Sequence, residues 1–161
     1  MVELTQRVRK VLLIALLVMA LDQASKAWLL YELGMIDGRR VVITDFFSLV
    51  MVWNHGVSFG MLAHAHDWMP YLLIVLALGV SAALFRLALR SESRLERIGF
   101  AMVVGGAIGN AIDRVRVGAV ADFFYFHLGD LGWPAFNVAD ASICIGVGLV
   151  MIYLLTHRPR A

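Results

Sequence analysis

The sequence predicts a membrane protein of four transmembrane helices with a small β element outside the membrane. Three observations support this fold class. Hydrophobic residues make up 61% of the chain and charged residues only 16%, whereas soluble domains average about 45–50% apolar and about 25% charged residues. The mean hydropathy is +0.80. Four apolar stretches, at about 11–30, 71–89, 98–115 and 135–155, approach the ~20 residues that a helix needs to cross the hydrocarbon core. We therefore expect one integral membrane domain over residues 1–161.

The first predicted span, residues 11–30, follows a short basic segment. A cleaved signal peptide is the alternative, because such peptides also place an apolar segment after basic residues. No A-x-A cleavage site follows, since Asp22 and Lys26 interrupt the small residues, and we predict a retained helix. Asp22 precedes Lys26 by four residues, the favourable order for an ion pair within a helix. The pair either neutralises itself or belongs to a site at this end of the helix.

The next segment, residues 31–69, is too polar and too varied in composition to span a membrane. Residues 41–53 (VVITDFFSLVMVW) are β-branched and aromatic, and they predict one or two strands. They run into the stretch Asn54-His55-Gly56-Val57-Ser58-Phe59-Gly60, whose glycines allow backbone geometry closed to other residues. We predict a small extramembrane sheet over about residues 38–66, with a shaped loop.

The third predicted span is uncharged from Ile98 to Ile112 and rich in small residues. Gly105 and Gly109 form a GxxxG spacing, which lets neighbouring backbones approach closely. Gly106, Asn110 and Asp113 share one helical face, so polar groups converge at one end of this helix.

The positive charges predict the orientation of the spans. Nine of the fourteen Lys and Arg residues lie in the N-terminal tail, the 86–97 connector and the C-terminal tail. Cytoplasmic segments carry an excess of these residues, so we expect both termini in the cytoplasm. This topology also accounts for the pI near 9.0 without a nucleic-acid partner. It brings seven polar residues to the outer surface: Asn54, Asn110, Asp113, Arg114, Asp122, Asn137 and Asp140.

Two aspartates between Ala121 and Ala141 are the main catalytic candidates. Asp122 opens an aromatic run, and Asp140 lies one turn into the fourth predicted span, on the same predicted helical face as Asn137. Carboxylates at the ends of spans are functional candidates because their burial costs free energy. The structural alternative is a turn aspartate and an aspartate that caps a helix.

Two carboxylates held close together share one proton, so that one acts as an acid and the other as a base. Such a pair activates water against an amide, as in aspartic proteases. Asn54, Asn110 and Asn137 would orient the pair or bind the substrate backbone. Arg114 has a structural alternative, an ion pair with Asp113.

Other catalytic patterns are weaker. Ser25 and Lys26 are adjacent in a predicted helix and do not face each other, and His55 with Ser58 lacks a third group. The HAHD stretch at 64–67 is an unspecific metal pattern without HExxH. Residues 129–130 supply only part of a GxGD motif, because position 127 is His. The lone Cys144 excludes an intramolecular disulfide framework, and we expect no metal and no organic cofactor.

Five blocks resemble, in order, the motifs of bacterial lipoprotein signal peptidase, also called signal peptidase II. They are Asp22-Gln23-Ala24-Ser25-Lys26, Asn54-His55-Gly56-Val57-Ser58-Phe59-Gly60, the stretch 105–114 (GGAIGNAIDR), Val120-Ala121-Asp122-Phe123 and Phe136-Asn137-Val138-Ala139-Asp140. The resemblance covers nearly the whole chain except the termini. It implies an aspartic peptidase of the bacterial inner membrane with four transmembrane helices, a small periplasmic β-sheet or cradle, and an active site facing the periplasm.

By this resemblance, Asp122 and Asp140 match the catalytic pair. Nine further residues match motif positions around the site: Asp22, Lys26, Asn54, Gly56, Asn110, Asp113, Arg114, Asn137 and Ala139. Ser58 is a mild departure, since the family often has a small apolar residue there. The implied substrates are diacylglyceryl-modified prolipoproteins, cut just before the lipidated cysteine. We expect a monomer surrounded by membrane lipids.

Two other classes of function remain as alternatives. A small proton-coupled transporter would use membrane carboxylates as proton relays, but it often shows internal repeats, and none is evident here. A non-catalytic membrane adaptor with structural ion pairs would leave Asp122 and Asp140 without a role.

Overall fold

The computed structural model describes residues 2–56, 68–129 and 131–157. The predicted loop beyond Gly56, including Ser58 and the HAHD stretch, and Asp130 lie outside the described residues. The elements in chain order are α1 (Val2–Ala27), a π-helical turn η1 (Trp28–Glu32), β1 (Arg40–Thr44), β2 (Phe47–Asn54), α2 (Met69–Arg90), α3 (Arg94–Val117), β3 (Val120–Leu128), β4 (Leu131–Gly132) and α4 (Val138–Thr156).

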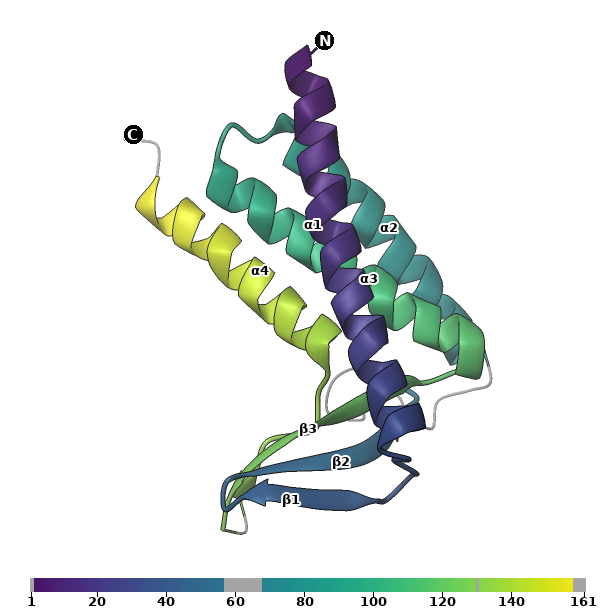
Figure 1. The fold of residues 1–161 in the computed structure, drawn as a ribbon. Helices are drawn as coiled ribbons and strands as arrows, with labels where there is room; N and C mark the ends of the chain where they lie inside the picture. Colours follow the sequence, from purple (N-terminus) through teal and green to yellow (C-terminus); the bar gives the residue numbers. More distant parts are fainter. Residues whose placement is uncertain (1, 57–67, 130, 158–161) are drawn as a thin grey trace.

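The prediction of four spans is confirmed. In the described part of the chain, four helices are long and apolar enough to cross a membrane: Glu3–Glu32, Met69–Arg90, Arg94–Val117 and Val138–Thr156. The start of α1 and the end of α4 lie at one end of the bundle, and the sheet lies at the other (Figure 1).

Capping residues set where the third and fourth helices begin. The third helix begins at Arg94 rather than near residue 98, since Ser93 caps it by accepting the Glu96 N–H. The fourth begins at Val138 rather than at 135, and Asn137 is its N-cap. Asn137 therefore precedes the helix instead of lying on the helical face of Asp140. Side-chain oxygens at the N-cap satisfy backbone N–H groups that the helix itself leaves unpaired.

Helix α3 packs against α1, α2 and α4, and its small residues permit this. A Cβ on Gly105 would lie 2.6 Å from the carbonyl oxygen of Ala15 in α1. A Cβ on Gly106 would lie 2.5 Å from the carbonyl oxygen of Ala139 in α4. The GxxxG prediction is confirmed, since Gly105 and Gly109 both face α1, where Gly109 lies against Asp22.

An antiparallel four-stranded sheet, in the order β1-β2-β3-β4, runs across the sheet end of the bundle (Figure 1). The stretch 41–53 forms two strands, β1 and β2, within the range that was predicted. The aromatic run after Asp122, for which no strand was predicted, is the longest strand of the sheet, β3. Its Phe123 is 1% exposed and packs with Leu49 and Met51 of β2 and with Leu29 of η1. This small core attaches the sheet to the end of the first span.

Candidate active site

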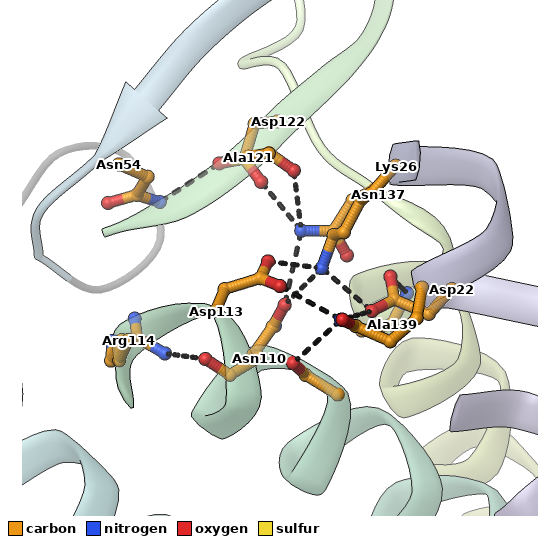
Figure 2. Close-up of polar contacts among 12 residues, drawn as sticks. Asp22, Lys26, Asn54, Asn110, Asp113, Arg114, Ala121, Asp122, Asn137 and Ala139 are labelled. Atoms are coloured by element: carbon orange, nitrogen blue, oxygen red, sulfur yellow. Dashed lines mark hydrogen bonds and ion pairs between the residues drawn. The ribbon is translucent and has the colours of Figure 1, made fainter. Parts of the chain in front are cut away.

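Asp122 lies on β3 where the sheet meets the helices, and its side chain is almost completely buried. Asn54, the last residue of β2, donates a hydrogen bond to Oδ2 of Asp122 at 3.0 Å. Asn137, the N-cap of α4, donates to Oδ1 at 2.7 Å. The two amides approach the carboxylate from opposite sides (Figure 2), so its orientation is set by two different elements.

Asp140 lies in the first turn of α4 and is half-buried. It forms a capping box with Asn137: its carboxylate accepts the Asn137 backbone N–H at 3.2 Å, and the Asn137 side chain accepts the Asp140 N–H at 2.9 Å. Asn110 of α3 donates to the other carboxylate oxygen at 2.8 Å. The structural alternative of a capping aspartate is thus right in part. The same side chain also faces the cleft described next.

A cleft of about 500 Å³ contains both carboxylates. Its lining residues are Asn54, Asn110, Arg114, Val120, Asp122, Trp133, Pro134, Ala135, Phe136, Asp140, Ala141, Ile143 and Cys144. A second hollow of about 460 Å³ also reaches Asp122 and lies over the sheet, against Arg40 and Tyr125. Asp122 therefore lies where a helix-side cleft and a sheet-side hollow meet.

Beneath the cleft lies a buried group of charges from two helices. Lys26 of α1 pairs with Asp22 at 2.7 Å and with Asp113 of α3 at 2.6 Å. Lys26 also donates to Oδ1 of Asn110 at 3.2 Å. The predicted ion pair between Asp22 and Lys26 is confirmed. Lys26 connects it to Asn110, whose side-chain amide donates to Asp140. Both readings of the pair therefore apply, since it neutralises charge and also adjoins the site.

Gln23 belongs to this group, although sequence reasoning assigned it no role. Its amide donates to Oδ1 of Asp113 at 2.8 Å, and also to Asp22 at 3.2 Å. The available signal was a long polar residue inside an apolar span, next to Asp22. The cleft residues Trp133, Pro134 and Ala135 were also missed, because nothing in their local pattern relates them to the two aspartates.

The proposed ion pair between Asp113 and Arg114 was wrong. Asp113 points to Lys26 and Gln23, whereas Arg114 points toward the cleft. Arg114 donates to the carbonyl oxygen of Gly56 at 2.7 Å and, more weakly, to that of Asn110 at 3.4 Å. Neighbouring residues on a helix point in different directions, which is why the two side chains take different partners. Arg114 thereby holds the chain just after β2 beside the site.

Burial in this setting changes the acidity of Asp122. Removal from water, and then the charge of Asp140, raise the pKa of Asp122 to about 7, while the hydrogen bonds from Asn54 and Asn137 act in the opposite direction. Desolvation and a neighbouring like charge both disfavour the ionised form of a carboxyl group. The pair can therefore retain a proton at neutral pH.

No group of three or more His, Cys, Asp and Glu residues that could hold a metal ion occurs in the described ranges. The chemistry that this geometry supports is acid–base catalysis by two carboxyl groups, one buried and one half-buried, at the wall of a cleft.

A family model described as "Signal peptidase (SPase) II" matches residues 14–156. The chain belongs to the signal peptidase II family. The lipoprotein signal peptidase of Azoarcus sp. (strain BH72) is 44% identical over 156 residues, which cover 93% of this chain and 86% of that protein. That of Rhodopseudomonas palustris (strain TIE-1) is 42% identical over 156 residues, covering 94% of this chain and 95% of that protein.

The fold has solved counterparts. A bacterial membrane enzyme determined by the in meso method has a TM-score of 0.80 to this structure at 27% identity, over 94% of each chain. A second one has a TM-score of 0.76 at 29% identity, over 91% of this chain and 92% of that one. The protein is therefore a multi-pass membrane peptidase of the signal peptidase II type, and the transporter and adaptor interpretations are unsupported.

Proposed function

We propose that this chain removes the signal peptide from diacylglyceryl-modified prolipoproteins by cutting before the lipidated cysteine, with Asp122 and Asp140 as the catalytic pair. The observation that carries this proposal is the shared partner of the two carboxyl groups. Asn137 donates its side-chain amide to Asp122 at 2.7 Å and its backbone N–H to Asp140 at 3.2 Å. One residue thus orients two carboxyl groups that line the same cleft.

The mechanism needs one proton between the two carboxyl groups. The ionised carboxylate takes a proton from a water molecule as the water attacks the scissile carbonyl, and the protonated carboxyl donates to the developing oxyanion. When the tetrahedral intermediate collapses, the C–N bond breaks and a proton from the pair passes to the leaving amine. The raised pKa of Asp122, about 7, supports a pair that is singly protonated at neutral pH.

The remaining motif residues support the pair in this proposal. Asn54, Asn110 and Asn137 orient the carboxyl groups through the hydrogen bonds described above. Arg114 holds Gly56 beside the cleft and adds positive charge there. The buried charges connect the first turn of α4 to α1 and α3. Asp22 of α1 accepts the backbone N–H of Ala139 in α4, and Lys26 of α1 pairs with Asp113 of α3.

The place of the cleft suits a lipidated substrate. An apolar signal helix with two acyl chains partitions into the bilayer, and its scissile bond would then lie near a membrane surface. The cleft lies where the sheet meets the helices, at the end away from the chain termini, and Ile143 and Cys144 of α4 extend its wall along the helix.

The location in the cell is part of the proposal. The basic residues at the start of α1 (Arg7, Arg9 and Lys10) and those of the 86–97 connector lie at the end of the bundle opposite the sheet (Figure 1), and positive charge favours the cytoplasmic side. We place the protein in the bacterial inner membrane as a monomer surrounded by lipid, with both termini in the cytoplasm and the cleft on the periplasmic side.

Cleavage of a diacylglyceryl-modified preprotein peptide by the purified protein in detergent tests the proposal. Loss of a general acid or base costs ~10²–10⁴-fold in rate, so Asp122→Asn and Asp140→Asn should each lose at least this much. The matched control is Asp45→Asn, because Asp45 is an exposed carboxylate in the turn between β1 and β2. It should cleave at the wild-type rate.

Helical content and melting of the two inactive variants should stay close to those of the wild-type protein. Activity within about tenfold of wild type in either variant would contradict the mechanism, because a general acid or base contributes at least ~10²-fold. Wild-type protein that fails to cleave the lipidated peptide would contradict the substrate assignment.

A further inference from the structure

The sheet-side hollow begins at Asp122 and reaches a guanidinium at the other end of the same sheet face. The carbonyl oxygen of Phe136 accepts the N–H groups of both Phe123 and Phe124, at 3.1 and 2.8 Å. Two residues opposite one mark a β-bulge, which interrupts the alternation of side chains along a strand. Asp122 before the bulge and Tyr125 after it therefore share one face of β3, and both line the hollow.

Arg40 of β1 supplies the guanidinium, and neutral side chains hold it in place. Its Nε donates to the hydroxyl of the buried Ser48 at 3.2 Å, and its Nη2 lies 2.9 Å from Nε2 of His127. A guanidinium has donors only, so Nε2 of His127 is the acceptor and this imidazole is neutral. The guanidinium also lies over the ring of Tyr125, 5.2 Å from its centroid. The positive charge is thus fixed in position without being neutralised.

Arg40 retains free donors that face the hollow. Ser48 and His127 occupy the Nε side of the guanidinium, which leaves the pair of N–H groups at its Nη1–Nη2 end. Among the residues that the structure describes, no carboxylate lies within ion-pair distance of Arg40. Two parallel N–H groups of a guanidinium match the two oxygens of a carboxylate. The chemistry of this end of the hollow therefore suits an acidic side chain.

The two hollows that meet at Asp122 suit different parts of a prolipoprotein. The helix-side cleft continues along α4 past Ile143 and Cys144. The sheet-side hollow ends at β1, which lies beyond the ends of the helices (Figure 1). The signal helix and the acyl chains of the substrate are apolar and stay in the bilayer, whereas the chain after the lipidated cysteine continues into water. The sheet-side hollow matches this last part.

On the basis of the proposed function, we propose that the sheet-side hollow binds the first residues of the mature lipoprotein and that Arg40 selects an acidic side chain there. Tyr125, beneath the guanidinium, is three residues from Asp122 along β3, which is about 10 Å at ~3.3 Å per residue. An extended peptide covers this distance in about three residues. The carboxylate therefore belongs to the second or third residue of the mature chain, where the lipidated cysteine is the first. Arg40 is a specificity-determining residue and takes no part in the bond cleavage.

Cleavage of matched lipidated peptides measures this preference. Diacylglyceryl-modified preprotein peptides carry Asp, Asn or Lys at the second and third mature positions and are otherwise identical. The ratio of kcat/KM values is the measure of discrimination. An exposed ion pair contributes up to about fivefold, so the wild-type protein should prefer the Asp peptide to the Asn peptide by about threefold to fivefold and cleave the Lys peptide least well. Added salt should reduce the preference, because it screens exposed charges.

Variants of two neighbouring arginines locate the source of the preference. Arg40→Gln should cleave the Asp and Asn peptides with equal kcat/KM, and Arg40→Glu should prefer the Lys peptide. The matched control is Arg39→Gln, which changes the net charge by the same amount. The Arg39 guanidinium is bonded to the carbonyl oxygens of Leu33 and Gly34, so this variant should keep the wild-type preference. Equal loss of preference in both Gln variants would show a general attraction of charge and would overturn the proposal.

The wild-type comparison needs no variant to fold, and it separates this inference from the proposed function. Equal kcat/KM for the Asp and Asn peptides, with cleavage that Asp122→Asn abolishes, would overturn the role of Arg40 and leave the proposed function intact. A loss in Arg40→Gln that is the same for all three peptides and requires phosphatidylglycerol in the micelles would overturn it in favour of a lipid phosphate at Arg40. No cleavage of any lipidated peptide would contradict the proposed function itself.

Discussion

The carboxylate of Asp22 accepts the backbone N–H of Ala139 at 3.0 Å, across 117 residues of sequence. The first N–H groups of a helix have no partner within it, so α1 supplies an acceptor for the first turn of α4. The next residue, Asp140, belongs to the proposed catalytic pair. The position of that carboxyl group thus depends on a charged residue in another span.

Replacement of Asp22 by Ala should destabilise the protein and reduce cleavage. It removes one partner of Lys26 and leaves the Ala139 N–H unpaired, and breaking a buried ion pair costs about 3–5 kcal/mol. Thermal melting in detergent measures the effect. Asp22→Asn can still accept the Ala139 N–H, so it should lose less stability than Asp22→Ala. The control is Asp37→Ala at an exposed position, and equal melting of the two Ala variants would contradict this role of Asp22.

Stability should depend on pH through Asp122. Its pKa rises from 3.8 to about 7 on folding, so between these values the folded state holds a proton that the unfolded state has lost. The stabilisation is complete below pH 3.8 and is lost as the pH rises through 7. Its upper bound is about 4 kcal/mol, at 1.36 kcal/mol per unit of pKa.

Denaturation of wild type and Asp122→Asn between pH 5 and pH 8 isolates this contribution, since the other titrating groups are common to both proteins. The stability of wild type relative to the variant should fall as the pH rises. A difference that is constant with pH would show that Asp122 is not protonated in the folded protein at acidic pH.

Replacement of Asn54 by Ala should shift the alkaline side of the activity profile to higher pH. The hydrogen bond from Asn54 favours the ionised form of Asp122, so its loss makes the proton harder to remove. A hydrogen bond to a charged group is worth about 1.5 kcal/mol, which corresponds to about one pH unit. The measurement is kcat against pH for the lipidated peptide. A shift to lower pH would contradict the assigned role of Asn54.

A Cβ at Gly106 should disturb the packing of α3 on α4. It would lie 2.5 Å from the backbone oxygen of Ala139, so the first turn of α4 has to move. We expect Gly106→Ala to cost about 1–3 kcal/mol, as overpacking does, and to reduce cleavage. The control is Gly79→Ala in α2, where nothing lies within 4 Å of the added carbon. Its stability should equal or exceed that of wild type, and similar losses in both variants would exclude the close contact as the cause.

Several features could be predicted from local pattern. Hydropathy and length locate the four spans, β-branched and aromatic residues locate β1 and β2, and the spacing of Gly105 and Gly109 predicts a close helix contact. Each of these signals lies within a few turns of chain or one strand. The strand β3 was missed because its aromatic run lacks the alternation of apolar and polar residues that marks a half-buried strand. Its pairing with β2 makes it a strand.

The sequence by itself determined the number of spans, the polar end of the third helix, and, by resemblance, the residues around the site. Only the tertiary structure decided how those residues pair. Asp113 pairs with Lys26 rather than with its neighbour Arg114, and Asn137 caps α4 and bridges two carboxyl groups. Hydropathy and spacing act along one segment, whereas the choice of partner depends on how glycine-lined helices pack and on the register of strands that are far apart in the chain.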